Sequence, residues 1–295
     1  MKETIGFIGL GHMGGPMAAN LVKAGYPVVG MDLSSAACAQ AALAGVEIAE
    51  SNPAAVSRAD IVITMLPAGK HVLSVWEEIL PSLKEEVLLL DCSTIDVESA
   101  CMAHNLGETS GYLTLDAPVS GGTVGAENAT LTFMVGGSES AFARAQGVLG
   151  VMGKRIIYCG KKGAGQVAKI CNNMILGISM LGVCEAFTLG EKLGLSHQAL
   201  YDVASVSSGQ CWALTTNCPV PGPVSSAPAN YDYQPGFAMS LMVKDLLLSQ
   251  QAALLAGVHT PLGAAAAHLF GLYEKQGHGG EDFSAIISLF QARNS

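Results

Sequence analysis

A lysine and an asparagine lie four residues apart in a stretch that is otherwise mainly apolar. Lys169 and Asn173 belong to the run from Gly163 to Leu193, which has no other cation before Lys192. On a helix, residues four apart share one face, so the ammonium group and the amide would lie side by side. A lone lysine on such a helix is more often a surface residue whose charged end reaches water. Its role therefore depends on what precedes it in the chain.

The glycine spacing near the N-terminus predicts a dinucleotide-binding turn. The apolar stretch 4–8 predicts a strand, and a glycine-rich turn and a helical apolar spacing follow it. In a G-x-G-x-x-G turn, the first glycine permits the tight turn, the second lets the backbone approach a pyrophosphate, and the third allows close packing of helix and strand. We therefore expect the cofactor to contact Gly9, Gly11, His12, Met13 and Gly14.

Asp32 stands at the end of the second predicted strand, 28–32, where this fingerprint places an acidic residue. A carboxylate at this position bonds both ribose hydroxyls of NAD and repels the 2'-phosphate of NADP, which generally needs an arginine nearby. No Lys or Arg occurs from Ala24 through Ser57. NAD is therefore the expected cofactor.

Strands and helices alternate through the first half of the chain, which predicts a doubly wound, mostly parallel sheet. The further predicted strands are 46–49, 60–65, 87–91, 112–116, 131–135 and 155–159. Ligands bind outside the carboxyl ends of such strands. The candidates that follow strands are Leu66 and Pro67, then Thr94, then Ser120, Gly121 and Gly122. The last three offer a hydroxyl and backbone N–H groups, which suit a carboxylate.

The second half of the chain has the apolar spacing of helices, at 165–193, about 197–215, 237–256, 261–275 and 282–292. We expect an α/β chain: a Rossmann-type NAD-binding domain at 1–162, then an all-α substrate and oligomerisation domain at 163–295, in which 163–193 is the interdomain helix. The proline-containing loop at 218–235 is long enough to be a binding loop or a subunit contact. The apolar C-terminal half predicts a homodimer or homotetramer.

Composition argues against several classes of protein. The chain has 15 basic and 24 acidic residues, and a net charge of -9 opposes binding to nucleic acid. Its eight cysteines include no Cys-x-x-Cys pair, and no His-x-x-x-His pair occurs, so we expect no metal site and a reducing, cytoplasmic compartment. We expect no signal peptide. The uncharged stretch between Asp245 and Glu274 is interrupted by Gln, His and Pro, which favours a buried helix pair over a membrane span.

Four blocks, in order, resemble the beta-hydroxyacid dehydrogenase family: 6–21, 116–122, 163–173 and 244–246. The segments 218–224 and 233–237 resemble the loop of its hydroxyisobutyrate branch, although Ser225 and Tyr231 depart from the residues expected there. The resemblance implies that Lys169 is the catalytic acid/base, that Asn173 bonds the substrate, and that the Ser-Gly-Gly segment holds the substrate carboxylate. It also places Thr94 at the junction of cofactor and substrate, and it implies that the second domain contributes Trp212, Phe237, Lys244 and Asp245, with Lys244 at the cofactor.

The activity that this resemblance implies is oxidation of 3-hydroxyisobutyrate to methylmalonate semialdehyde, a step of valine catabolism, with hydride transfer to NAD. A neutral amine at Lys169 would accept the hydroxyl proton. A tartronate semialdehyde reductase, or another short-chain 3-hydroxyacid dehydrogenase, would carry the same blocks and is the alternative. A non-catalytic NAD-binding module is a more distant alternative, against which the presence of Lys169 argues.

Overall fold

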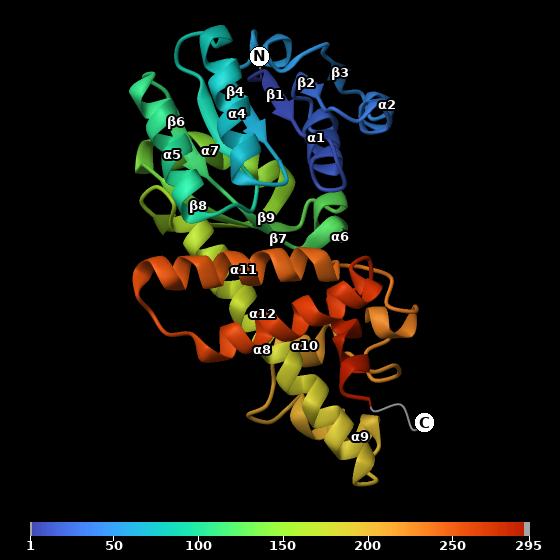
Figure 1. Cartoon of the computed structure of the whole chain (residues 1–295). Coiled ribbons are helices and arrows are strands. Elements are labelled where there is room, and N and C mark those ends of the chain that lie inside the picture. Colours follow the sequence, from blue (N-terminus) through green and yellow to red (C-terminus); the bar gives the residue numbers. More distant parts are fainter. Residues whose placement is uncertain (1, 292–295) are drawn as a thin grey trace. The chain divides into compact units, whose positions relative to one another are not determined.

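The computed structural model describes residues 2–291, whose contacts form two compact units (Figure 1). The first unit ends at Lys169 and the second begins at Ile170. This division falls inside helix α8 (Ala164–Lys192), which confirms the long helix predicted at 163–193. The first turns of α8, with Lys169, therefore belong to the first unit, and Asn173 belongs to the second.

A nine-stranded sheet forms the centre of the first unit, in the order β3-β2-β1-β4-β5-β6-β8-β7, with β9 paired to β8. Strands β1 to β6 run parallel, and β8 is antiparallel to β6 and β7. This confirms the mostly parallel sheet. The strands are β1 (Ile5–Ile8), β2 (Val28–Met31), β3 (Glu47–Ile48), β4 (Ile61–Thr64), β5 (Leu88–Asp91), β6 (Leu113–Asp116), β7 (Val119–Ser120), β8 (Leu131–Gly137) and β9 (Gly153–Gly160).

Helices cover both faces of this sheet, because its strands bury apolar side chains on both sides. One apolar cluster joins the sheet to Met17 and Leu21 of α1 and to Leu149 of α7, and a second joins it to Trp76 of α4 and Ala103 of α5. Side-chain oxygens of Ser or Asp cap the N-termini of α2, α3, α5 and α7. The helices are α1 (Gly14–Lys23), α2 (Ser35–Leu43), α3 (Asn52–Val56), α4 (Gly69–Ile79), α5 (Val97–Thr109), α6 (Gly122–Glu127) and α7 (Glu139–Met152), with a 3-10 turn at Leu80–Ser82.

The second unit is helical and has its own apolar core. After α8 it contains α9 (His197–Ala204), α10 (Trp212–Thr215), a 3-10 turn (Pro228–Asn230), α11 (Met239–Ala256), α12 (Pro261–Tyr273), a π-helical turn (Glu274–His278) and a 3-10 helix (Phe283–Leu289). The single helix predicted at 197–215 is wrong, because the polar and glycine-containing segment 205–211 separates α9 from α10. The end of the helix predicted at 282–292 lies outside the described residues.

The uncharged stretch after Asp245 forms α11 and α12, so the two predicted helices are present, but they are not buried throughout, since Leu254 and Leu262 are 82% and 67% exposed. Gly257 ends α11 in the left-handed conformation, with a φ of +65°, and Pro261 begins α12. Among the described residues, α8 alone is long and apolar enough to cross a membrane, and core helices of soluble proteins also meet this test.

Candidate active site

The glycine turn between β1 and α1 leaves space where a dinucleotide would lie. A Cβ atom at Gly14 would lie 1.9 Å from the carbonyl oxygen of Gly9, and one at Gly9 would lie 2.3 Å from that of Met65, so the protein's own packing excludes side chains at both. A Cβ at Gly11 would meet no atom within 4 Å. Its backbone therefore faces open space, as expected where the turn must approach a ligand.

Asp32 is held beside this glycine turn by two backbone N–H groups. Its Oδ2 accepts a hydrogen bond from the N–H of Leu10 at 2.7 Å, and its Oδ1 accepts one from the N–H of Ser34 at 2.7 Å. In the turn itself, His12 is exposed, and Met13 precedes α1 without giving it a side-chain cap. An uncapped helix N-terminus, an open Gly11 and a fixed carboxylate after β2 together fit NAD.

The segments after β4 and β5 are tied together through the carboxylate of Asp91. Its Oδ1 accepts hydrogen bonds from Thr64 Oγ1 at 2.7 Å and from Ser93 Oγ at 2.6 Å. Ser93 Oγ in turn accepts one from the N–H of Leu66 at 2.8 Å. The half-buried Leu66 is thereby fixed beside the turn that bears Thr94, as expected at the carboxyl edge of the sheet, and Pro67 next to it is exposed.

Asp91 itself is buried and incompletely bonded. Burial raises the pKa of Asp91 to about 6 and the charge of Asp116 adds to the rise, against the opposing effect of the hydrogen bonds from Ser93 and Thr64. Its Oδ2 is buried and has no hydrogen-bond partner among residues 2–291. The ionised form of this carboxyl group is therefore unfavourable in the folded protein.

The Ser-Gly-Gly segment is a strand end followed by a helix start. Ser120 ends β7, which pairs with β8, and α6 begins at Gly122. Gly121 and Gly122 have φ angles of +134° and +62°, a region that favours glycine. Gly121 is the N-cap of α6 and cannot cap it with a side chain. Ser120 thus directly precedes the start of α6, and the carboxylate contact of this segment stays a prediction.

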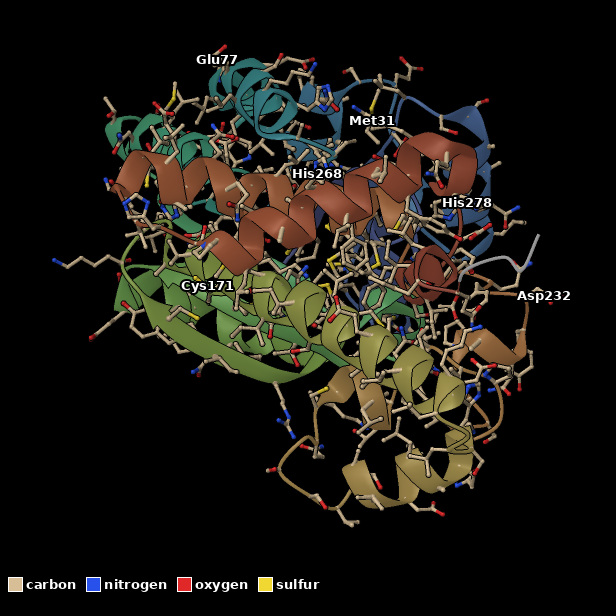
Figure 2. The ribbon with its side chains drawn as sticks, turned by 60° about the horizontal axis from the view of Figure 1, so that its bottom comes forward. Met31, Glu77, Cys171, Asp232, His268 and His278 are labelled. Carbon is tan, nitrogen blue, oxygen red and sulfur yellow. The ribbon has the colours of Figure 1, made fainter. Side chains whose placement is uncertain are left out.

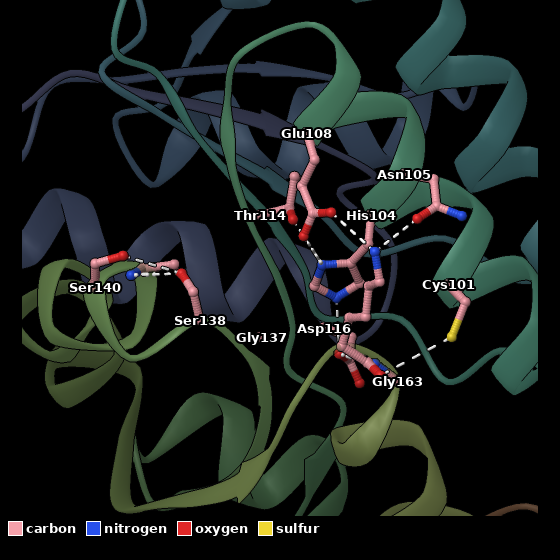
Figure 3. A network of polar contacts seen from close by, with 12 residues as sticks. Cys101, His104, Asn105, Glu108, Thr114, Asp116, Gly137, Ser138, Ser140 and Gly163 are labelled. Carbon is pink, nitrogen blue, oxygen red and sulfur yellow. Dashed lines mark hydrogen bonds and ion pairs between the residues drawn. The ribbon is translucent and has the colours of Figure 1, made fainter.

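The N-terminus of α8 is capped by the buried carboxylate of Asp116, at the end of β6. Asp116 Oδ1 accepts from the N–H of Gly163 at 2.8 Å, and Oδ2 accepts from the N–H of Gln166 at 2.9 Å. On its other side, Oδ1 lies 2.9 Å from Nε2 of His104, whose Nδ1 lies 2.6 Å from Thr114 Oγ1 (Figure 3). This network fixes the start of α8 to the sheet, and sequence reasoning missed its role.

Lys169 lies at the end of the part of α8 that belongs to the first unit. Its side chain is buried, with 6% of its surface exposed, so it is not the surface lysine that a lone cation on an apolar helix suggests. Asn173 follows one helical turn later on the same helix and is 2% exposed. Burial of a lysine at this place supports a functional role.

In the second unit, Asn173 is held by polar neighbours. Its Nδ2 donates to Oδ2 of the buried Asp245 at 2.5 Å, and its Oδ1 accepts from Nδ2 of Asn172 at 3.0 Å. The ammonium group of Lys244 lies 3.7 Å from Asp245 Oδ1. The second unit therefore brings three of the predicted residues together: Asn173, Lys244 and Asp245. Cys171, by contrast, lies on the exposed side of α8 (Figure 2).

Phe237 is positioned by a buried carboxylate that the sequence did not indicate. Asp282 Oδ2 accepts from the N–H groups of Gly236 at 3.1 Å and Phe237 at 3.0 Å. Its Oδ1 accepts from Asn217 Nδ2 at 3.0 Å and Ser284 Oγ at 2.7 Å. The ring of Phe237 packs edge-on against Phe283, with centroids 5.8 Å apart.

Trp212 begins α10 and is 51% exposed. Its place in the site stays a prediction. Among residues 2–291, no three His, Cys, Asp or Glu side chains are arranged to hold a metal ion.

Two family models match the chain. The NAD binding domain of 6-phosphogluconate dehydrogenase matches residues 4–160, and the NAD-binding domain of NADP-dependent 3-hydroxyisobutyrate dehydrogenase matches residues 163–290. The first match covers the sheet and the glycine turn, and the second begins at the capped N-terminus of α8.

Proteins of known name are similar over nearly the whole chain. A probable 3-hydroxyisobutyrate dehydrogenase of Mycobacterium tuberculosis is 50% identical over 290 residues, 98% of each chain. The NAD-dependent L-serine dehydrogenase of Pseudomonas aeruginosa is 46% identical over 293 residues, again 98% of each. A solved structure of the Mycobacterium tuberculosis 3-hydroxyisobutyrate dehydrogenase with L-serine shares 50% identity, covers 99% of this chain and 100% of that chain, and has a TM-score of 0.97.

The first family model, an NAD binding domain, agrees with the geometry of the glycine turn, so NAD is the cofactor. The relatives are named as dehydrogenases, which excludes the alternative of a non-catalytic NAD-binding module. The chain therefore belongs to the 3-hydroxyisobutyrate dehydrogenase family of NAD-dependent 3-hydroxyacid dehydrogenases.

Proposed function

We propose that the chain oxidises 3-hydroxyisobutyrate to methylmalonate semialdehyde, with Lys169 as the acid/base. The observation that carries the proposal is the burial of Lys169 one helical turn before Asn173, on a helix whose start is fixed by Asp116. The supporting comparison is with 3-hydroxyisobutyrate dehydrogenases that are 42–50% identical to this chain. Methylmalonate semialdehyde formation fits a place in valine catabolism.

The reaction removes a hydride from the carbinol carbon and a proton from its hydroxyl. Bound NAD supplies the hydride acceptor. Lys169, as a neutral amine, takes the hydroxyl proton as the carbonyl forms, and its ammonium form returns a proton to the carbonyl oxygen in the reverse reaction.

The remaining predicted residues have binding roles in this proposal. Ser120 and the N–H groups at Gly121 and Gly122 hold the substrate carboxylate, which the start of α6 also favours electrostatically. The Asn173 amide bonds the substrate hydroxyl, and Asp245 orients that amide by accepting from its Nδ2. Phe237 provides an apolar contact, which suits a substrate that carries a methyl group.

L-Serine is the second candidate substrate. It shares the carboxylate and the primary hydroxyl of 3-hydroxyisobutyrate and has an ammonium group in place of the methyl group. A relative named as an NAD-dependent L-serine dehydrogenase is 46% identical, and a related structure was solved with L-serine. An ammonium group would need an acceptor at the position where a methyl group needs an apolar contact.

A substrate panel decides between these candidates. We expect the highest kcat/KM with 3-hydroxyisobutyrate and NAD, a lower value with L-serine, and the lowest with glycerate. Glycerate is the product of a tartronate semialdehyde reductase, so it represents that alternative in an oxidation assay. A higher kcat/KM with L-serine would overturn the assignment of the substrate while leaving the reaction class in place.

Replacement of Lys169 tests the acid/base. Lys169→Ala should lower kcat by about 10²- to 10⁴-fold, the usual contribution of general acid–base catalysis, and should leave NADH binding measurable by fluorescence. Lys192→Ala, at the exposed end of the same helix, is the matched control and should keep wild-type kcat. Near-normal turnover by Lys169→Ala would refute the role of Lys169.

A further inference from the structure

The side chain of Gln166 bonds the backbone on both sides of Thr94. Its Oε1 accepts a hydrogen bond from the N–H of Ile95 at 3.1 Å, and its Nε2 donates to the carbonyl oxygen of Ser93 at 2.8 Å. Gln166, Ser93 and Ile95 are all buried, so water cannot readily replace either bond. An amide that spans the two flanks of one residue fixes the position of that residue's backbone.

The backbone of Gln166 is also fixed. Its N–H donates to Oδ2 of Asp116, as part of the cap that starts α8. Lys169 follows three residues later and therefore lies on the same face of the helix. Gln166 thus connects the carboxyl end of β6, the turn after β5 that bears Thr94, and the turn of α8 that bears Lys169, all within the first unit.

We propose that Gln166 is a positioning residue that holds Thr94 in register with the turn of α8 that bears Lys169. The inference rests on the proposed function, in which Lys169 is the acid/base and Thr94 lies at the junction of cofactor and substrate. Gln166 acts through these residues, because both ends of its amide are bonded to the backbone. A misplacement of about 1 Å in a reacting group can lower a rate on the order of 10²-fold. Loss of Gln166 should therefore lower kcat more than it raises KM.

The variant Gln166→Glu tests this proposal, because glutamic acid has the shape of glutamine. When protonated, its hydroxyl donates to the Ser93 carbonyl and its own carbonyl accepts from the Ile95 N–H, as the amide does. When ionised, it offers only acceptors, one of which faces the Ser93 carbonyl oxygen. Because position 166 is fully buried, the pKa of the introduced carboxyl group should be raised above its ordinary value. We therefore expect kcat relative to wild type to be about 10- to 100-fold lower at pH 8 and to recover toward the wild-type value at pH 6.

Other groups in this region also titrate, so wild type and variant are compared at each pH. The titratable groups nearby are Asp91 and Asp116 at the ends of β5 and β6, His104 on α5 and Lys169 on α8. Because both proteins contain these groups, the ratio of the two kcat values reports the added carboxyl group. Recovery on protonation would distinguish positioning by two hydrogen bonds from a general disturbance of packing.

A second variant and a control complete the experiment. Gln166→Asn keeps the amide but is one methylene shorter, so it cannot bond both flanks of Thr94 and should lose kcat equally at pH 6 and pH 8. Gln198→Glu changes an exposed glutamine whose Nε2 bonds Asp202 on α9, and it should keep wild-type kcat. Circular dichroism and NADH binding establish that each variant is folded.

Three results would overturn the proposal. These are wild-type kcat at pH 8 in either folded variant, an equal loss at pH 6 and pH 8 in Gln166→Glu, and failure of both variants to fold, which would make Gln166 a purely structural residue. Failure of the proposed function has a different signature, since it would show as absent wild-type turnover of hydroxy acids or as an active Lys169→Ala protein.

Discussion

The buried carboxyl group of Asp91 should make the stability of the first unit depend on pH. Its pKa is about 6 in the folded protein and 3.8 as a reference for the unfolded chain. Because the folded pKa is the higher one, the folded state holds the proton more tightly. The stabilisation by protonation is complete below about pH 3.8 and is lost as pH rises through 6. The difference between these two pKa values corresponds to about 3 kcal/mol of unfolding free energy.

Asp91→Asn should remove this dependence. The amide group that this substitution introduces keeps one oxygen for the hydrogen bonds from Thr64 and Ser93, and its NH2 group takes the place of Oδ2, which has no partner among the described residues. An unpartnered buried NH2 group costs about 1–3 kcal/mol at every pH. Relative to the variant, wild type should therefore be more stable at pH 5 than at pH 8, because only wild type gains stability from protonation.

Urea unfolding followed by tryptophan fluorescence measures this difference. The chain has two tryptophans, so a Trp212→Phe background leaves Trp76, whose Nε1 donates to the same Thr64 Oγ1 that bonds Asp91. Trp76 therefore reports the first unit. Asp60→Asn is the control: the hydrogen bond and charge of Lys84 lower the pKa of Asp60 from 3.8, so its stabilisation is fully present from pH 5 to pH 8 and this variant should differ from wild type by a constant amount over that range. A constant difference between wild type and Asp91→Asn from pH 5 to pH 8 would refute the reasoning.

Two further predictions concern the cofactor. Replacing Asp32 with Ala removes the carboxylate that repels a 2'-phosphate. The preference for NAD over NADP, measured as the ratio of the two kcat/KM values, should therefore fall by about tenfold or more, which corresponds to about 1.4 kcal/mol of binding free energy. An unchanged ratio would contradict the role of Asp32. In a thermal melt without cofactor, Gly14→Ala should be less stable than wild type, because the added Cβ would lie 1.9 Å from the carbonyl oxygen of Gly9. Gly11→Ala should melt like wild type and bind NADH more weakly, because the added Cβ meets only open space where the cofactor would lie. Equal melting temperatures for the two alanine variants would contradict this distinction.

Much of the fold could be predicted because its signals are local. The strands of the parallel sheet are short apolar runs, and the helices of the second unit show apolar spacing with glycine or proline at their ends. The strand β7 has only two residues, too few to show alternation. The segment 197–215 was predicted as one helix because its apolar spacing continues past Ala204, but the polar stretch before Trp212 breaks it.

The positioning residues could not be predicted because their contacts are distant in sequence. Gln166 lies 73 residues from Ser93 in the chain, and the Asp116 cap spans 47 residues to Gly163. Within its own segment, Gln166 is an ordinary polar residue near a helix start. Only the fold brings its amide to the turn after β5, so the sequence suggested Thr94 and Lys169 as functional and gave no reason to connect them.

Three buried carboxyl groups, those of Asp91, Asp116 and Asp282, fix backbone segments of the site. Each accepts two or more hydrogen bonds from a segment that carries a predicted functional residue. In Asp116 and Asp282 both oxygens accept, so the NH2 group of an amide would face a donor unfavourably, whereas in Asp91 these bonds all reach Oδ1. The cost is a buried charge, which Asp91 shows by its raised pKa. At Asp91, stability is therefore lowered at a place where the backbone of the site is fixed, and substitutions of these three aspartates should change catalysis without any contact to the substrate.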